Sequence, residues 1–193
     1  ANSYTVKFDG NGAEGTMADQ SFTYDVEQAL TANGFTKTGY TFAGWKLGDT
    51  TYEDGATVKN LATEGALTLT AQWTANSYTV KFDGNGAEGT MVDQSFTYDV
   101  EQALTANGFT KTGYTFAGWK LGDTTYEDGA TVKNLATEGA LTLTAQWTAN
   151  SYTVKFDGNG AEGTMVDQSF TYDVEQALTA NGFTKTGYTF AGW

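Results

Sequence analysis

The chain has 193 residues, no Cys, no Pro and no His, and its 23 acidic and 10 basic residues give a formal net charge of −13. Without Cys and His it lacks disulfides, thiolate metal sites, thiol nucleophiles and a histidine general base. The acidic surface repels phosphate groups, so we expect no nucleic-acid partner. No stretch approaches the roughly 20 apolar residues of a membrane-spanning helix, so we expect no membrane span in this chain.

The sequence repeats itself with a period of 74 residues. Residues 1–74, 75–148 and 149–193 are identical except at one position, where Ala18 of the first copy is Val in the other two. A period of 74 residues is long enough for each copy to be a small domain. We therefore predict three domains with these bounds. With these bounds the third is incomplete, because it lacks the last 29 residues of the period, although the period alone fits an incomplete unit at either end of the chain.

Each copy opens with two predicted strands. Residues 3–9 alternate apolar and polar side chains, which predicts a strand with one buried face. Asp9-Gly10-Asn11-Gly12 tolerates positive φ, so residues 10–16 are expected to form a loop. The alternation resumes over residues 21–26 and predicts a second strand, the hairpin partner of the first.

A short helix is predicted to follow over residues 26–33. Asp25 stands three residues before Gln28, the spacing of a capping box, and Asn33-Gly34 offers a left-handed end. A helix of this length is stable only when it packs on a sheet.

The rest of the copy is predicted to be β-structure. Residues 40–47 form a strand whose alternation changes phase at Gly44, which indicates a β-bulge. A short irregular strand covers residues 56–61, and residues 67–73 alternate most cleanly. The order β-β-α-β-β-β predicts an α+β domain, a mixed sheet crossed by one short helix. Only residues 74–77 separate this domain from the next, which restricts relative motion of the copies.

Three segments carry a family resemblance: residues 4–9 (YTVKFD), 39–45 (GYTFAGW) and 67–73 (LTLTAQW). They resemble the Listeria–Bacteroides repeat, a module found in tandem in bacterial cell-surface proteins and in the B-repeats of internalin B. The resemblance covers the whole of each copy. It implies a β-grasp-like fold with parallel first and last strands, no catalytic residues, and an extracellular or cell-surface location. Copies joined head-to-tail would then form an elongated rod, with a rise of roughly 30–35 Å per copy.

No catalytic, cofactor-binding or metal-binding residue is predicted. Residues 9–14 superficially resemble a calcium loop, but they lack the flanking helices and the bidentate Glu of an EF-hand, so a turn is favoured. Gly10, Gly12 and Gly15 match the dinucleotide-binding spacing, yet no helix follows to hold phosphate. Trp45 and Trp73 are expected in the core and not in a sugar-stacking platform.

We therefore predict a protein that is not an enzyme. The leading hypothesis is a structural stalk or spacer that projects a binding or adhesive region. One alternative is a self-assembling extracellular fibre subunit, in which the open edge of residues 149–193 accepts a strand from another copy of the chain. A second alternative is a weak, multivalent glycan- or protein-binding array. The expected partners are the neighbouring repeats of the same chain and, in the fibre hypothesis, other copies of the chain.

Overall fold

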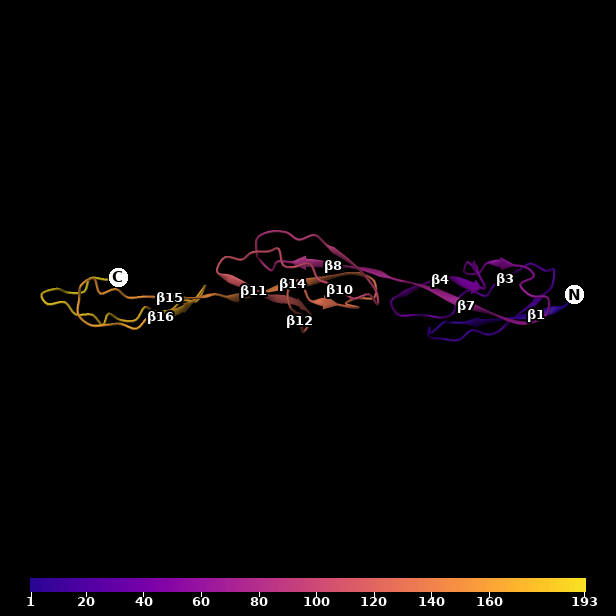
Figure 1. Ribbon diagram of the computed structural model, residues 1–193, viewed down its shortest axis with the longest axis horizontal. Helices are drawn as coiled ribbons and strands as arrows, with labels where there is room; N and C mark the ends of the chain where they lie inside the picture. Colours follow the sequence, from indigo (N-terminus) through magenta and orange to yellow (C-terminus); the bar gives the residue numbers. More distant parts are fainter. The chain divides into compact units, whose positions relative to one another are not determined.

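The computed structural model describes residues 1–193, and its regular elements are all strands (Figure 1). None of its segments is a helix of the length and hydropathy needed to cross a membrane. The chain divides into two compact units, and the second copy contributes residues to both. The first unit comprises residues 1–81, 93–104 and 131–141, and the second comprises residues 82–92, 105–130 and 142–193.

The first unit holds one five-stranded sheet with the order β2-β1-β7-β4-β5. β1 runs parallel to β7 and antiparallel to β2, while β4 runs antiparallel to both β7 and β5. Two further strands, β3 and β6, form a separate antiparallel pair. The bounds are β1 Ser3–Asp9, β2 Gln20–Thr23, β3 Gln28–Ala29, β4 Tyr40–Leu47, β5 Thr50–Tyr52, β6 Thr57–Val58 and β7 Gly65–Ala75.

The strands of the second copy repeat this order as β12-β11-β14-β8-β9, with a separate β10-β13 pair. Their bounds are β8 Ser77–Asp83, β9 Gln94–Thr97, β10 Gln102–Ala103, β11 Tyr114–Leu121, β12 Thr124–Tyr126, β13 Thr131–Val132 and β14 Gly139–Ala149. In the third copy β15 (Ser151–Val154) and β16 (Gln168–Thr171) form one antiparallel pair.

Several predicted elements are confirmed. The first strand has the predicted bounds, and the parallel pairing of the first and last strands, implied by the family resemblance, is present. The bulge in β4 also lies where the phase change placed it, because the register with β7 shifts between Phe42 and Gly44. Gly44 has a φ of 128°, and a Cβ there would lie 2.6 Å from the backbone oxygen of Tyr52. Only glycine fits this position.

The predicted helix over residues 26–33 is wrong, and with it the α+β fold class with a crossing helix. Asp25 has a φ of 64°, whereas an N-cap residue adopts the β-region. Its N–H donates to the Asn60 side chain (2.6 Å), and the Asn60 amide donates back to the Asp25 carboxylate (2.8 Å). Residues 28–29 pair with β6, and the Leu30 N–H donates to the Ala56 oxygen (2.9 Å). Long-range pairing thus takes the backbone groups that a marginal helix would use.

The core of the first copy combines side chains of the sheet with side chains from the region of the β3–β6 pair. Tyr4, Val6, Trp45 and Leu69 are fully buried, and no polar or charged residue belongs to the buried set. The Trp45 ring lies 4.9 Å from the Phe8 ring and 4.9 Å from the Phe42 ring. This aromatic cluster confirms the predicted core position of Trp45.

The one sequence difference between copies lies on the surface. Val92 is 86% exposed and Val166 is 88% exposed, and Ala18 at the same position is exposed as well. No packing contact depends on the side chain there, which explains why the copies tolerate either residue.

Candidate functional site

The loop after β1 is a turn, as predicted. Its Asn11 N–H donates to the Asp9 carboxylate (2.9 Å), and Asn11 and Gly12 both have positive φ. The Asn11 side chain donates to the Ala71 oxygen of β7 (3.0 Å), so it holds the loop against the sheet. Glu14, between Gly12 and Gly15, forms a single bridge with Thr36, and no helix begins after the loop, as a phosphate site would need. The structure brings no three acidic side chains together around a common point.

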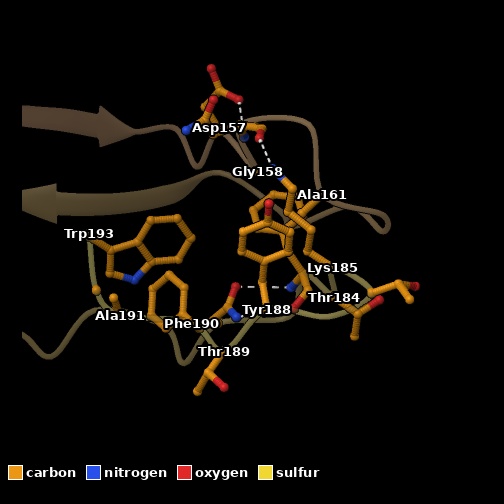
Figure 2. A pocket seen from close by; sticks show the side chains of 15 residues that line it. Asp157, Gly158, Ala161, Thr184, Lys185, Tyr188, Thr189, Phe190, Ala191 and Trp193 are labelled. Atoms are coloured by element: carbon orange, nitrogen blue, oxygen red, sulfur yellow. Dashed lines mark hydrogen bonds between the residues drawn. The ribbon is translucent and has the colours of Figure 1, made fainter.

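A pocket of about 650 Å³ lies in the third copy and is lined by residues of the 157–193 segment (Figure 2). Trp193 and Phe190 line one side of it, with their rings 4.9 Å apart, and Trp193 is 52% exposed. In the first copy the equivalent of Trp193 is Trp45, which is fully buried. There Trp73 of β7 packs on Phe42 with the ring centroids 5.4 Å apart. The pocket is therefore the core surface that β7 covers in the first copy, and we assign it no ligand.

A network of hydrogen bonds and aromatic contacts lies where one copy meets the next. We call it the copy joint. In the first unit it consists of Gly39, Tyr40, Thr41, Asn76, Tyr98 and Asp99.

Asn76 links the two copies through its backbone and its side chain. It is the single residue between β7 and β8. Its N–H donates to the Gly39 oxygen of the first copy (2.8 Å), and its own oxygen accepts from the Tyr98 N–H of the second (2.8 Å). The Thr41 hydroxyl donates to the Asn76 side-chain oxygen (2.7 Å). A linker bonded on both sides has little freedom to rotate.

Two tyrosines pack edge-to-face across the copy joint. The Tyr40 and Tyr98 rings lie 5.8 Å apart at 77°, a favourable aromatic geometry. Gly39 has a φ of 76°, and a Cβ at this position would overlap the Tyr98 ring. The Lys37 ammonium lies 4.8 Å from the centre of the Tyr40 ring, a cation–π contact. Glycine at position 39 is thus required both by the backbone and by the neighbouring copy.

Asp99 is the charged centre of the copy joint. Its carboxylate accepts from the Tyr40 hydroxyl (2.8 Å) and from the Asn134 amide (2.8 Å), and the Lys133 ammonium lies 3.6 Å away. Its own N–H donates to the Asn134 side-chain oxygen (2.6 Å). The hydrogen bond from Asn134 and then that from Tyr40 hold the pKa of Asp99 below its ordinary value. The same hydrogen bond to Asp99 raises the pKa of Tyr40.

The second unit contains a second joint of the same design. The Tyr114 and Tyr172 rings lie 5.7 Å apart, and the Tyr114 hydroxyl donates to the Asp173 carboxylate (2.9 Å). A Cβ at Gly113 would overlap the Tyr172 ring. The Thr115 hydroxyl donates to the Asn150 side-chain oxygen (2.6 Å). At the equivalent position in the third copy, no atom lies within 4 Å of a Cβ built at Gly187.

Sequence reasoning missed the residues of the copy joint. The short linker indicated restricted motion, but it named none of the side chains that restrict it. The one available signal was the identity of the copies, because every copy carries both halves of the joint. Gly39, Tyr40 and Thr41 stand on one side, and the Tyr and Asp at positions 24 and 25 of the following copy stand on the other.

Comparison with known proteins places these copies in a family. The model of the Listeria-Bacteroides repeat domain matches residues 4–72, 78–146 and 152–193. Internalin H of Listeria monocytogenes is 40% identical over 156 residues, which cover 76% of this chain and 25% of that protein. A protein named as a Gly-rich membrane protein of Evansella cellulosilytica is 34% identical over 172 residues, which cover 81% of this chain and 19% of that protein. The chain thus spans about a quarter or less of these two relatives. The matches confirm a bacterial cell-surface or extracellular location.

Among solved structures, the type 2 repeat of the mucus binding protein MUB from Lactobacillus reuteri covers 78% of this chain and is itself covered completely. Its sequence identity is 14% and its TM-score is 0.21. The structure titled Mub-RV covers 75% of this chain at 8% identity, with a TM-score of 0.18. We draw no inference from either likeness.

Proposed function

Because the chain belongs to the Listeria–Bacteroides repeat family, we propose that it is a non-enzymatic spacer that projects a binding or adhesive region of a larger bacterial surface protein. The copy joint is the observation that carries this proposal. A spacer must hold successive modules at a defined orientation, and otherwise its ends collapse towards each other as in a flexible chain.

The contacts of the copy joint suit this task. The orientation of the first two copies is held by three direct hydrogen bonds, one aromatic pair and one glycine packed against a tyrosine ring. All of the groups are supplied by the repeat itself, so a further copy brings its own joint. Copy number can then set reach without new surface chemistry.

Small-angle X-ray scattering on chains with one additional or one fewer 74-residue copy tests the proposal. We expect the maximum dimension to rise by a constant increment for each copy. In a Tyr98→Ala chain the increment between the first two copies should shrink and the distribution of distances should broaden. Tyr24→Ala is the matched control, because Tyr24 holds the same position in the first copy and no preceding copy packs on it. A maximum dimension that does not grow with copy number would refute the spacer proposal.

A second candidate function is supported by a groove that recurs in all three copies. In the first copy it has a volume of about 300 Å³ and is lined by the glycine-rich loop after β1 and by Met17 and Phe35. The second copy repeats it at about 300 Å³ and the third at about 360 Å³. This size is at the low end for small-molecule sites, so one copy would bind weakly and the array would supply avidity.

A glycan array probed with the full chain tests this weak multivalent binding. Binding that falls steeply when Gly12→Lys and Gly86→Lys block two of the grooves would support it. Both glycines line a groove and have open space around them, so a lysine fits there at the cost of strain at a positive φ. Gly55→Lys, at a positive φ outside the groove, is the control for that strain. If the unmodified chain gives no glycan signal above background, this candidate is removed. Self-assembly through residues 149–193 stays a prediction.

A further inference from the structure

The path of the chain through each copy has a mechanical consequence. In the first copy β1 and β7 are parallel neighbours, paired in register from Tyr4↔Gly65 to Asp9↔Thr70. The chain enters at the first residue of β1 and leaves from the last residue of β7. Since the strands are parallel, these two points lie at opposite ends of the paired region. Tension along the chain therefore slides β1 against β7.

Sliding and peeling load hydrogen bonds differently. When two strands are pulled past each other, every hydrogen bond between them is strained at the same time. When they are pulled apart from one end, the bonds break one after another, and each single bond is weak. From the parallel placement of entry and exit strands we propose that the first copy is a tension-bearing module whose β1–β7 pairing resists force. This goes beyond the spacer proposal, because a spacer can set distance without carrying load.

Two side-chain hydrogen bonds extend the β1–β7 pairing past its last residue pair. The Trp73 indole N–H donates to the Gly10 oxygen (2.9 Å), and the Asn11 amide donates to the Ala71 oxygen (3.0 Å). Both join the loop after β1 to the end of β7, so both are strained by the same sliding motion. The second copy has the same two bonds, from Trp147 to the Gly84 oxygen and from Asn85 to the Ala145 oxygen.

The neighbours of β7 hold it in place, so that tension acts on the hydrogen bonds between β1 and β7. β7 is paired on its other edge with β4, from Tyr40↔Ala75 to Lys46↔Thr70. On the buried face of β1 and β7, the exposed fraction of each side chain is at most 1% for Tyr4, Val6, Leu69 and Ala71. Water cannot replace the strained hydrogen bonds from this face until the buried side chains separate. β7 is thus held by β1 and β4 at its two edges and by the core on its buried face.

The absence of Cys makes a direct test feasible, because cysteine handles can be placed at will. The full chain is stretched by optical tweezers between Asn2→Cys and Thr74→Cys, which slides β1 along β7. In a second chain the handles are Asn2→Cys and Thr63→Cys, which lie at the same end of the pairing and peel it. All three sites are exposed. We expect the rupture force at equal loading rate to be several times higher for the sliding pair. Equal forces would overturn the proposal.

A variant separates this pairing from general stability. Trp73→Phe removes the bond to the Gly10 oxygen but keeps a ring against Phe42. It should lower the sliding force and leave the peeling force unchanged. Trp147→Phe makes the same change in the copy outside the handles and should alter neither force. If Trp73→Phe lowers both forces equally, the bond acts on overall stability and the proposed force resistance is wrong. Scattering of the unloaded chain, which tests the spacer proposal, does not depend on these outcomes.

Discussion

The hydroxyl of Tyr40 donates a 2.8 Å hydrogen bond to the carboxylate of Asp99, a residue of the following copy. The pair belongs to the copy joint, where the Tyr40 and Tyr98 rings also pack against each other across the two copies. The same relationship recurs between Tyr114 and Asp173. The repeat unit therefore encodes its connection to its neighbour as well as its own fold.

Replacing the glycine of the copy joint should loosen it. Gly39→Ala adds a Cβ where the Tyr98 ring lies and also places alanine at a φ of 76°. The backbone cost alone is roughly 1–2 kcal/mol. Gly187→Ala is the matched control, because Gly187 has a φ of 78° and open space around it. The measurement is the distance distribution between spin labels at Ser21→Cys and Ser95→Cys. It should broaden for Gly39→Ala and stay unchanged for Gly187→Ala, whereas equal distributions would show that the Tyr98 contact does not fix orientation.

Acid should weaken the copy joint. The pKa of Asp99 is lowered from 3.8, chiefly by the Asn134 hydrogen bond. A depressed folded pKa means that the stabilisation is fully present above the ordinary value and is lost as the pH falls through the lowered one. The copy joint should thus persist from neutral pH down to about pH 4 and loosen below it.

The same pair of spin labels, followed from pH 7 to pH 2, reports this transition. Asp99→Asn should remove the acid transition and start from a broader distribution. Asp25→Asn makes the same change in the first copy, where no preceding Tyr donates to the carboxylate, and should leave the transition in place. A transition that survives in Asp99→Asn would assign it to another carboxylate.

The strands could be predicted from the sequence because their signals are local. The alternation over residues 3–9 depends on neighbouring residues and a buried face, and the change of phase at Gly44 marks the bulge directly. The predicted helix is wrong because a capping box is a local signal, whereas the conformation of this segment depends on contacts with distant residues. Asp25 and Gln28 form a good capping box, but Asn60, 35 residues away, holds Asp25 at a positive φ. The copy joint could not be predicted for the same reason, because Gly39 and Tyr98 become neighbours only when two copies fold.

A substitution at a core position should lower the free energy of unfolding far more than a substitution at the one variable position. Leu69 is fully buried in β7, so Leu69→Ala removes packing on both the β1 and β4 sides and should cost about 2–5 kcal/mol of the free energy of unfolding of the first copy. Val92→Ala restores the residue found at position 18, at a site that is 86% exposed. It should change stability by less than about 0.5 kcal/mol.

Urea denaturation followed by tryptophan fluorescence measures both changes. Because the first and second copies are almost identical, the wild-type chain should unfold them in overlapping transitions, and Leu69→Ala should split off an early one. Leu143→Ala makes the same substitution in the second copy and should split off a transition of similar size. If Leu69→Ala instead shifts the whole curve without splitting it, the copy joint couples the copies strongly enough for them to unfold together. In that case Gly39→Ala, combined with Leu69→Ala, should restore two separate transitions.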